Sequence, residues 1–166
     1  ALIDDMSRPF PQAANGGRWE YIADTVMGGV SSGGMTRAAI AGRTANRLTG
    51  RVSTDNNGGF VQMALDLAGG AACDASGYDG IALSVRGNGE VYNLHLRTDA
   101  VTRPWQSYRA SFTAPDEWTE LTLPFAVLEP HRLNAPFNPA ALRRLGIVAI
   151  GRPFDADIAV ARIAFA

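Results

Sequence analysis

The sequence predicts one all-β domain folded as an antiparallel β-sandwich, and three observations lead to this fold class. The chain has 166 residues, which is the size of one ordinary domain. Its 18 glycines and 9 prolines interrupt it roughly every 8 to 15 residues, a spacing typical of sandwiches and barrels. Between these breaks, apolar and polar residues alternate, as they do in strands with one buried face. We favour a jelly roll, although an immunoglobulin-like sandwich and a closed barrel would share this pattern.

Nine segments have the alternation and composition of strands. In the segment 60–67, Val61, Met63 and Leu65 fall on one face. The predicted strands are residues 19–26, 36–40, 60–67, 81–85, 91–98, 107–112, 118–123, 145–150 and 158–165. A Gly-Asn-Gly turn at 87–89 predicts that strands 81–85 and 91–98 form a hairpin.

One short helix is expected over residues 138–145. Asn138 can cap its first turn, Pro139 suits the first helical position, and Gly146 can end it. No linker or repeat divides the chain, so residues 1–166 are expected to form a single domain.

The composition excludes several classes of protein. The formal net charge is −1, so the chain lacks the basic surplus of proteins that bind nucleic acid through its phosphates. All fifteen basic residues are arginine, which excludes lysine nucleophiles and the P-loop lysine. Cys73 is the only cysteine, so neither an intrachain disulfide nor a cysteine-based zinc site can form. The chain has no run of about 18 apolar residues and opens with no signal or transit peptide, so we expect no transmembrane segment.

The first candidate site is the glycine-rich loop at residues 24–34. Gly28 and Gly29 allow positive φ and close approach of the backbone, and Asp24 and Ser31 can hydrogen-bond exposed loop amides. Together with Met27, these residues would form a binding loop. Alternatively, Asp24 holds a purely structural turn, which the residues alone favour.

The second candidate is the polar turn at residues 50–60, where Asn56 and Asn57 precede two glycines. Oxygen atoms of Asp55, Asn57 and Asp66 would suit calcium, but the spacing of an EF-hand is not met because the intervening residues run into a strand. A tight turn is the favoured interpretation, and we expect no metal ion or cofactor.

The third candidate is the polar face of the predicted strand 91–98. Asn93, His95 and Arg97 alternate with apolar residues, so they share one face of the sheet. Such a face normally meets solvent. With Trp105 and Tyr108 nearby, it also resembles the polar and aromatic surfaces that bind sugars or peptides.

Little in the sequence predicts catalysis. The chain has no His-x-x-x-His pair, Gly-x-Ser-x-Gly elbow or dinucleotide fingerprint. Its sixteen acidic residues include no pair that the sequence marks as the two carboxylates of a glycosidase. We therefore expect a binding protein rather than an enzyme.

Two blocks of sequence are specific enough to indicate a family. The first is Asp-Thr-Val-Met-Gly-Gly-Val-Ser-Ser-Gly at residues 24–33, and the second is Gly-Arg-Val-Ser at 50–53 followed by Asn-Asn-Gly-Gly-Phe at 56–60. These blocks resemble the complex I intermediate-associated protein 30 family. Agreement continues through residues 78–81, 86–89, 92–97, 105–108, 118–125 and 147–151.

The resemblance implies a galactose-binding-like β-sandwich related to mitochondrial chaperone-like factors that assemble respiratory complex I. Those relatives carry a targeting region ahead of the domain, whereas this chain starts almost at the domain. We therefore expect a stand-alone bacterial protein in the cytoplasm, either free or peripheral at the inner membrane. Its expected partner is a protein, such as a subunit of an assembling respiratory complex. The alternative is a carbohydrate or another small polar ligand, bound through Asn93, His95, Arg97 and Trp105.

Overall fold

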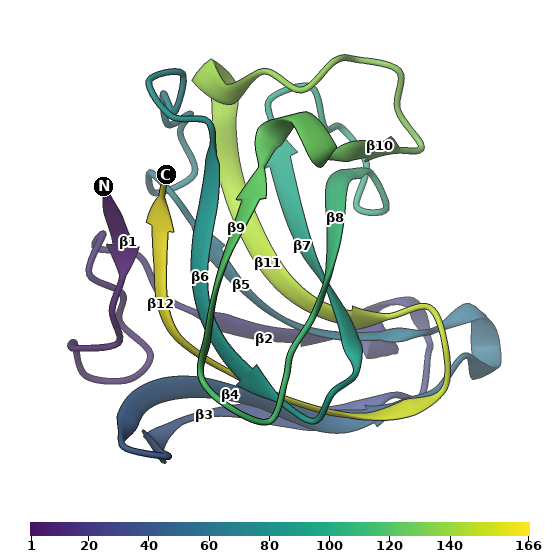
Figure 1. The fold of residues 1–166 in the computed structure, drawn as a ribbon. Coiled ribbons are helices and arrows are strands. Elements are labelled where there is room, and N and C mark those ends of the chain that lie inside the picture. Colours follow the sequence, from purple (N-terminus) through teal and green to yellow (C-terminus); the bar gives the residue numbers. More distant parts are fainter.

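The chain folds into two six-stranded sheets that pack face to face (Figure 1). This computed structural model describes the backbone of residues 1–166 and every side chain except that of Asn57. All strand pairs are antiparallel. The predicted fold class, an antiparallel β-sandwich, is therefore confirmed.

The first sheet, which we call sheet I, has the strand order β3-β4-β12-β6-β9, and β1 pairs with β12. Its strands are β1 (Leu2–Asp4), β3 (Ser32–Ile40), β4 (Arg43–Val52), β6 (Gly80–Gly87), β9 (Thr119–Pro124) and β12 (Phe154–Phe165). The second, sheet II, has the order β10-β8-β7-β11-β5-β2. Its strands are β2 (Glu20–Ala23), β5 (Phe60–Asp66), β7 (Val91–Thr98), β8 (Ser107–Thr113), β10 (Glu129–His131) and β11 (Leu142–Ile150).

Single turns of 3-10 helix lie in the connections between strands. They are η1 (Asp24–Met27), η2 (Asp55–Asn57), η3 (Phe125–Val127) and η4 (Pro139–Ala141). In the backbone that the structure describes, the longest helix has four residues, and none is long or apolar enough to cross a membrane.

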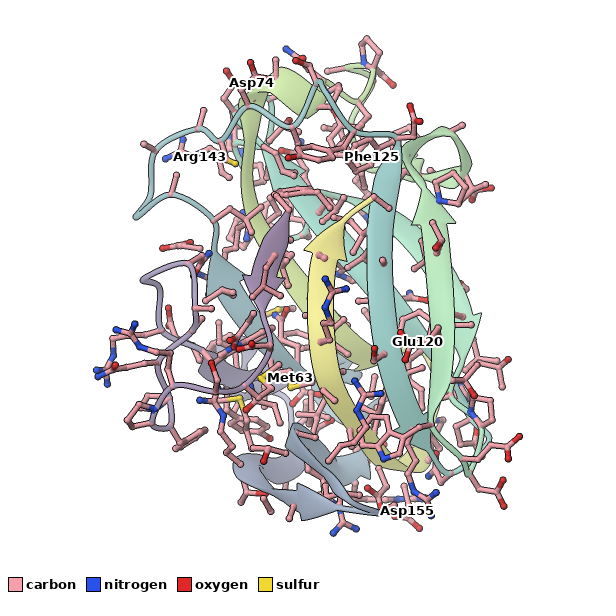
Figure 2. All side chains as sticks on the ribbon, turned by 60° about the vertical axis from the view of Figure 1, so that its left-hand side comes forward. Met63, Asp74, Glu120, Phe125, Arg143 and Asp155 are labelled. Atoms are coloured by element: carbon pink, nitrogen blue, oxygen red, sulfur yellow. The ribbon has the colours of Figure 1, made fainter. Side chains whose placement is uncertain are left out.

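The core lies between the two sheets and follows the alternation seen in the sequence. On β5, Val61, Met63 and Leu65 are fully buried, as the pattern of segment 60–67 predicts. Figure 2 shows Met63 in the interior, whereas Glu120 and Asp155 belong to the exposed surface of sheet I. Along β7, burial alternates strictly, so the polar residues of this strand lie on the face of sheet II that points away from the core.

The predicted hairpin between residues 81–85 and 91–98 is wrong, although both strands are present. β6 pairs with β9 and β12 in sheet I, whereas β7 pairs with β8 and β11 in sheet II. The turn at 87–89 carries the chain across the sandwich, where the N–H groups of Gly87 and Gly89 donate to the carbonyls of Pro115 and Ala114. Both strands bury one face in the same core, so alternation alone cannot distinguish a hairpin from a crossover.

The helix predicted over 138–145 is reduced to the single turn η4. Asn138 does cap this turn, since its side chain accepts a hydrogen bond from the backbone N–H of Ala140 (3.1 Å). From Leu142 onward the chain is strand β11, which pairs with β5 on one side and β7 on the other. Pairing in the middle of a sheet overrides the local helix signals.

Strand β4 has no counterpart among the predicted strands. Three arginines and a glycine interrupt its alternation. It forms a long hairpin with β3 through Ala41 and Gly42, which both adopt positive φ angles (46° and 84°). The short strands β1 and β10 were also not predicted, because three residues are too few to show a period.

Candidate binding groove

A groove with a volume of about 710 Å³ crosses the outer face of sheet II. Its floor includes Ala64 on β5, Gly146 on β11, His95 on β7 and Arg109 on β8. These four residues are successive cross-strand partners. They share one face because each alternates with core residues along its own strand, so the groove runs across the strands.

The two ends of the groove are formed by segments far apart in the sequence. On the side of β2 and β5, the turn η1 contributes Val26 and Met27, which are 73% and 56% exposed. On the side of β8 and β10, the β7–β8 connection contributes Trp105, which is 53% exposed. Parts of the two surfaces that the sequence suggested separately therefore line one groove.

Gln106 holds the connection that carries Trp105. Its Oε1 atom accepts hydrogen bonds from the backbone N–H groups of Thr102 (2.9 Å) and Arg103 (3.0 Å). Its Nε2 atom donates to the carbonyl of Arg132 (3.0 Å), which follows β10. Hydrogen bonds of Gln106 thus fix the loop that carries the exposed indole.

Four of the predicted site residues line the groove: Met27, His95, Arg97 and Trp105. Asn93 lies on the same face of β7, but its Oδ1 atom accepts a hydrogen bond from Ser111 (2.9 Å) and the residue is outside the lining.

The prediction that Tyr108 belongs to this surface is wrong. Tyr108 is fully buried; its hydroxyl donates to the carbonyl of Ala135 (2.8 Å), and its ring packs edge-on against Phe137. The neighbouring positions on β8, Ser107 and Arg109, line the groove instead. Alternation along β8 puts Tyr108 on the opposite face from both.

Asp24 is fully buried and is surrounded by hydrogen-bond donors from its own chain. Its Oδ1 atom accepts from the backbone N–H of Ser31 (3.0 Å). Its Oδ2 atom accepts from the Ser31 hydroxyl and from the backbone N–H groups of Gly59 (2.6 Å) and Phe60 (3.2 Å). Burial by itself raises the pKa of the Asp24 carboxyl, but these hydrogen bonds outweigh it, and the pKa lies below its usual value. Asp24 therefore ties the η1 loop to the start of β5.

The other predicted loop residues have comparable structural roles. A Cβ atom on Gly29 would lie 2.5 Å from the Asp24 carboxyl carbon, so a larger residue cannot be accommodated without movement of the loop. Gly28 ends η1 with a φ of 85°, and Asn56 is an exposed turn residue with a φ of 56°. Asn57 was also predicted as a site residue, and its side chain lies outside the described part of the structure. For Asp24 and these loop residues, the geometry supports the structural turn that the sequence favoured.

His95 is the buried polar group on the floor of the groove. Its Nε2 atom is buried and has no hydrogen-bond partner among the described residues. Burial, and then the positive charges of Arg109, His131 and Arg97, lower the pKa of His95 to about 3. The imidazole is therefore neutral at physiological pH and keeps an unused polar atom within the groove lining.

Several groove residues were not among the predicted site residues. They are Ile22, Phe60, Gln62, Arg109, His131, Arg132, Arg144, Val148 and Ile150. A signal for some of them was present, because residues 145–150 are almost entirely apolar, which is typical of a strand covered on both faces. No such signal marked the arginines, which resemble ordinary surface residues in the sequence.

Neither candidate turn supplies a metal site among the described residues. No group of three or more His, Cys, Asp or Glu side chains there is arranged to hold an ion. Asp66, one of the possible calcium ligands, instead pairs with Arg144 (2.7 Å).

Solved structures with a similar fold include several carbohydrate-binding modules. The family 11 module of a cellulosomal cellulase from Clostridium thermocellum superposes with a TM-score of 0.78 at 11% identity, covering 98% of this chain and 91% of that one. A family 11 module from the same organism, in complex with a β-1,3-1,4-mixed-linked tetrasaccharide, gives 0.73 at 11% identity, with 98% and 92% covered. A family 30 module from that organism gives 0.60 at 17% identity, with 82% and 91% covered. These likenesses confirm the predicted galactose-binding-like, jelly-roll type of sandwich.

Sequence comparison defines the family. Curated protein sequences give no match. The family described as complex I intermediate-associated protein 30 (CIA30) matches residues 9–159. This span includes both diagnostic blocks, the ten strands β2 to β11 and the first half of β12, so the chain belongs to the CIA30 family.

Proposed function

We propose that this domain is a non-enzymatic binding module that holds a segment of a protein partner in the groove of sheet II during assembly of a respiratory complex. The observation that carries the proposal is the apolar half of the groove. There, Phe60, Val148 and Ile150 line the sheet, and Val26 and Met27 expose more than half of their surface at the rim. Exposed apolar side chains at the rim of an apolar-lined groove indicate a site of protein interaction.

Two further observations support a binding role. The described lining of the groove contains no aspartate or glutamate, so it offers no carboxylate pair for glycoside hydrolysis. Membership of the CIA30 family supports a partner among the subunits of respiratory complex I.

The test adds a charge to the rim. Asp in place of Met27 would bring a carboxylate into the apolar contact and abolish binding, because desolvating an unpaired charge is costly. Thr36→Asp is the matched control, since Thr36 is exposed on β3 in sheet I. Membrane extracts of the source organism are passed over the immobilised wild type and both variants, and complex I subunits are quantified by mass spectrometry.

We expect complex I subunits to be enriched by the wild type and by Thr36→Asp, and lost with Met27→Asp. If the wild type enriches none of these subunits, the assembly role is wrong. If Met27→Asp retains them as well as the control does, the partner binds elsewhere.

One observation favours a second function, the binding of a carbohydrate. The exposed indole of Trp105 lies in the same groove as the polar groups of Gln62, His95 and Arg97, and a structural neighbour binds a mixed-linked tetrasaccharide. Titration calorimetry with that tetrasaccharide tests this function. Binding that disappears in Trp105→Ala would support it, and no heat at millimolar sugar would exclude this ligand.

A further inference from the structure

Charge is unevenly distributed within the groove. The half formed by β7, β8, β10 and their connections carries the cationic and imidazole side chains His95, Arg97, Arg109, His131 and Arg132. No aspartate or glutamate belongs to the described lining, although the whole chain has 16 acidic residues and a formal net charge of −1. The positive charge is therefore a local property of the groove and not of the protein.

Among the described residues, Arg97, Arg109 and Arg132 have no carboxylate partner. Among the described ion pairs, Arg144 is the groove arginine that pairs with acids, namely Asp66 and Glu20. Arg109 instead donates from Nε to the hydroxyl of Ser107 (2.8 Å). Its cross-strand neighbour on β10, Glu129, forms no ion pair with it.

Burial makes the unpaired charges of Arg97 and Arg109 costly in the free protein. It lowers the pKa of Arg97, with smaller effects from Arg144 and Arg143. It also lowers the pKa of Arg109, to which Arg132 adds. An anion bound between these side chains would offset the cost, because an opposite charge stabilises the protonated guanidinium.

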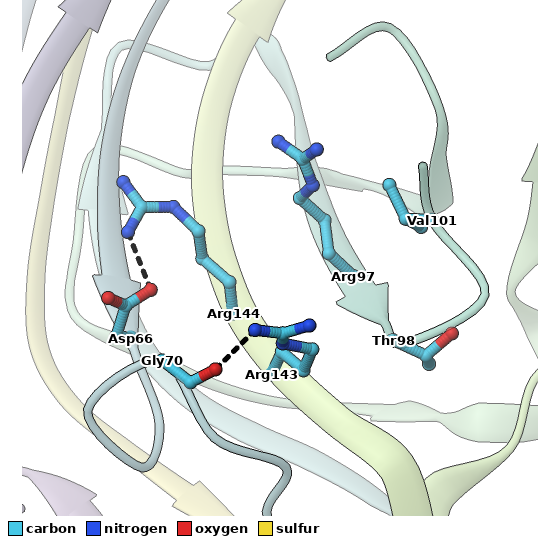
Figure 3. Close-up of a pocket in the computed structure, with 7 residues that line it drawn as sticks. All are labelled: Asp66, Gly70, Arg97, Thr98, Val101, Arg143 and Arg144. Atoms are coloured by element: carbon cyan, nitrogen blue, oxygen red, sulfur yellow. Dashed lines mark hydrogen bonds and ion pairs between the residues drawn. The ribbon is translucent and has the colours of Figure 1, made fainter. Parts of the chain in front are cut away.

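A second, smaller pocket adjoins the groove, and its lining contains three arginines and one acid, Asp66, which pairs with Arg144. It has a volume of about 320 Å³ and shares Arg97 and Arg144 with the groove. Figure 3 shows these two side chains projecting side by side from β7 and β11, with Arg143 below them. Arg143 donates to the carbonyl of Gly70, and Arg97 donates from an Nη atom to the carbonyl of Arg103 (3.4 Å). We call this the arginine pocket.

We infer that the groove recognises an extended acidic segment of the partner, whose carboxylates pair with Arg97, Arg109 and Arg132 while its apolar side chains cover the apolar half. The inference rests on the proposed function and adds the chemistry of the partner. A guanidinium can pair with a carboxylate through two parallel hydrogen bonds. The arginine pocket would receive a further carboxylate at the end of the segment.

The dimensions of the groove suit a short peptide. Six strands spaced by about 4.8 Å span roughly 24 Å, which is the length of about seven residues of extended chain. The aliphatic side chains of Ile22, Val148 and Ile150 offer no hydrogen bonds to sugar hydroxyls, which would lose water without compensation. A peptide with apolar residues toward one end and acidic residues toward the other meets both halves of the groove.

The probes are synthetic peptides of about eight residues in which one half contains Leu and Phe and the other half contains Asp. A matched set carries Asn at every Asp position, and an acidic oligosaccharide, oligogalacturonate, is the third probe. Binding to the full chain is measured by titration calorimetry at low and moderate salt. Arg97→Gln and Arg109→Gln are the test variants. Arg51→Gln is the control, because Arg51 is an exposed arginine on β4 in sheet I.

We expect the Asp peptides to bind, with affinity that falls as salt screens the charges. Affinity should drop at least about tenfold for the Asn set and for each groove variant, and remain unchanged in Arg51→Gln. Equal binding of the Asp and Asn sets would overturn the inference. So would an absence of peptide binding, and binding of oligogalacturonate alone would assign the groove to an acidic glycan.

The proposed function is tested separately by the extract experiment. If Arg97→Gln and Arg109→Gln still enrich complex I subunits as the wild type does, the groove does not recognise an acidic segment, but the proposed assembly role is retained. If the wild type enriches none, the assembly role fails regardless of the peptides.

Discussion

Asp24 and His95 both belong to features that the sequence marks as candidate binding sites, yet the structure gives them opposite environments. The buried carboxylate of Asp24 accepts four hydrogen bonds from its own chain. The buried Nε2 atom of His95 has no partner among the described residues, and the arginines near it have no carboxylate. The number of internal partners thus separates a polar residue that holds a loop from one that remains available to a ligand.

The energetic consequences differ in the same way. A buried polar group that is fully hydrogen-bonded stabilises the native state, whereas one without a partner costs desolvation free energy. The loops around Asp24 are therefore part of the fold, whereas the cationic half of the groove lowers the free energy of unfolding of the free protein. Binding of a complementary ligand would offset this loss of stability.

Substituting Asp24 with Asn should have the largest effect on stability. The amide would place N–H groups against donors from Ser31, Gly59 and Phe60, and the charge-assisted hydrogen bonds would be lost. We expect the free energy of unfolding to fall by about 3 kcal/mol or more, as measured by urea denaturation. Asp55→Asn, at an exposed position in the adjacent turn, should change it by less than about 0.5 kcal/mol. Similar values for the two variants would contradict the structural role of Asp24.

The fold class was predictable because strand alternation and turn residues act locally. The predictions of a hairpin at 87–89 and of a helix over 138–145 failed, because the outcome there depends on which distant strands pair. β6 and β7 show the same alternation whether they share a sheet or face each other, and the pairing of β11 with β5 and β7 overrides the signals at Asn138 and Pro139.

The candidate site was only partly predictable for a related reason. His95, Arg97 and Trp105 were found because a polar face on a strand is visible in the sequence. Tyr108 was misplaced by one position on β8, which reverses the face. Arg109 and Arg132 become informative only when the ion pairs of the structure are known, because no described carboxylate pairs with either of them, not even Glu129 opposite Arg109.

The pH dependence of stability separates the two regions. The pKa of His95 is lowered to about 3 from its ordinary 6.5, so below about pH 6.5 the unfolded chain binds a proton there that the native state does not. Native stability should therefore decline as the pH falls from 6.5 toward 3. Asp24, whose pKa is lowered from 3.8, stabilises the fold above that pH and loses this contribution only as the pH falls through its lowered pKa.

His95→Gln should flatten the decline between about pH 6.5 and pH 4, as measured by urea denaturation at a series of pH values. His131→Gln is the comparison. Its pKa is also lowered, by burial and by Arg109 and Arg132, but its Nε2 is not among the buried atoms without a partner, so a smaller flattening is expected. An unchanged slope in His95→Gln would show that the imidazole is already solvated in the native groove.

The smallest effect on stability is expected at Arg109. Arg109→Gln removes a cation that has no acidic partner among the described residues and lies beside His95, so the free energy of unfolding should change by less than about 0.5 kcal/mol or rise slightly. Arg144→Gln is the matched variant within the same groove. It breaks partly exposed ion pairs with Asp66 and Glu20, so a loss of up to about 1 kcal/mol is expected. If urea denaturation shows Arg109→Gln to be the more destabilising of the two, Arg109 supports the fold as Asp24 does, and the cationic half of the groove loses its assignment to a ligand.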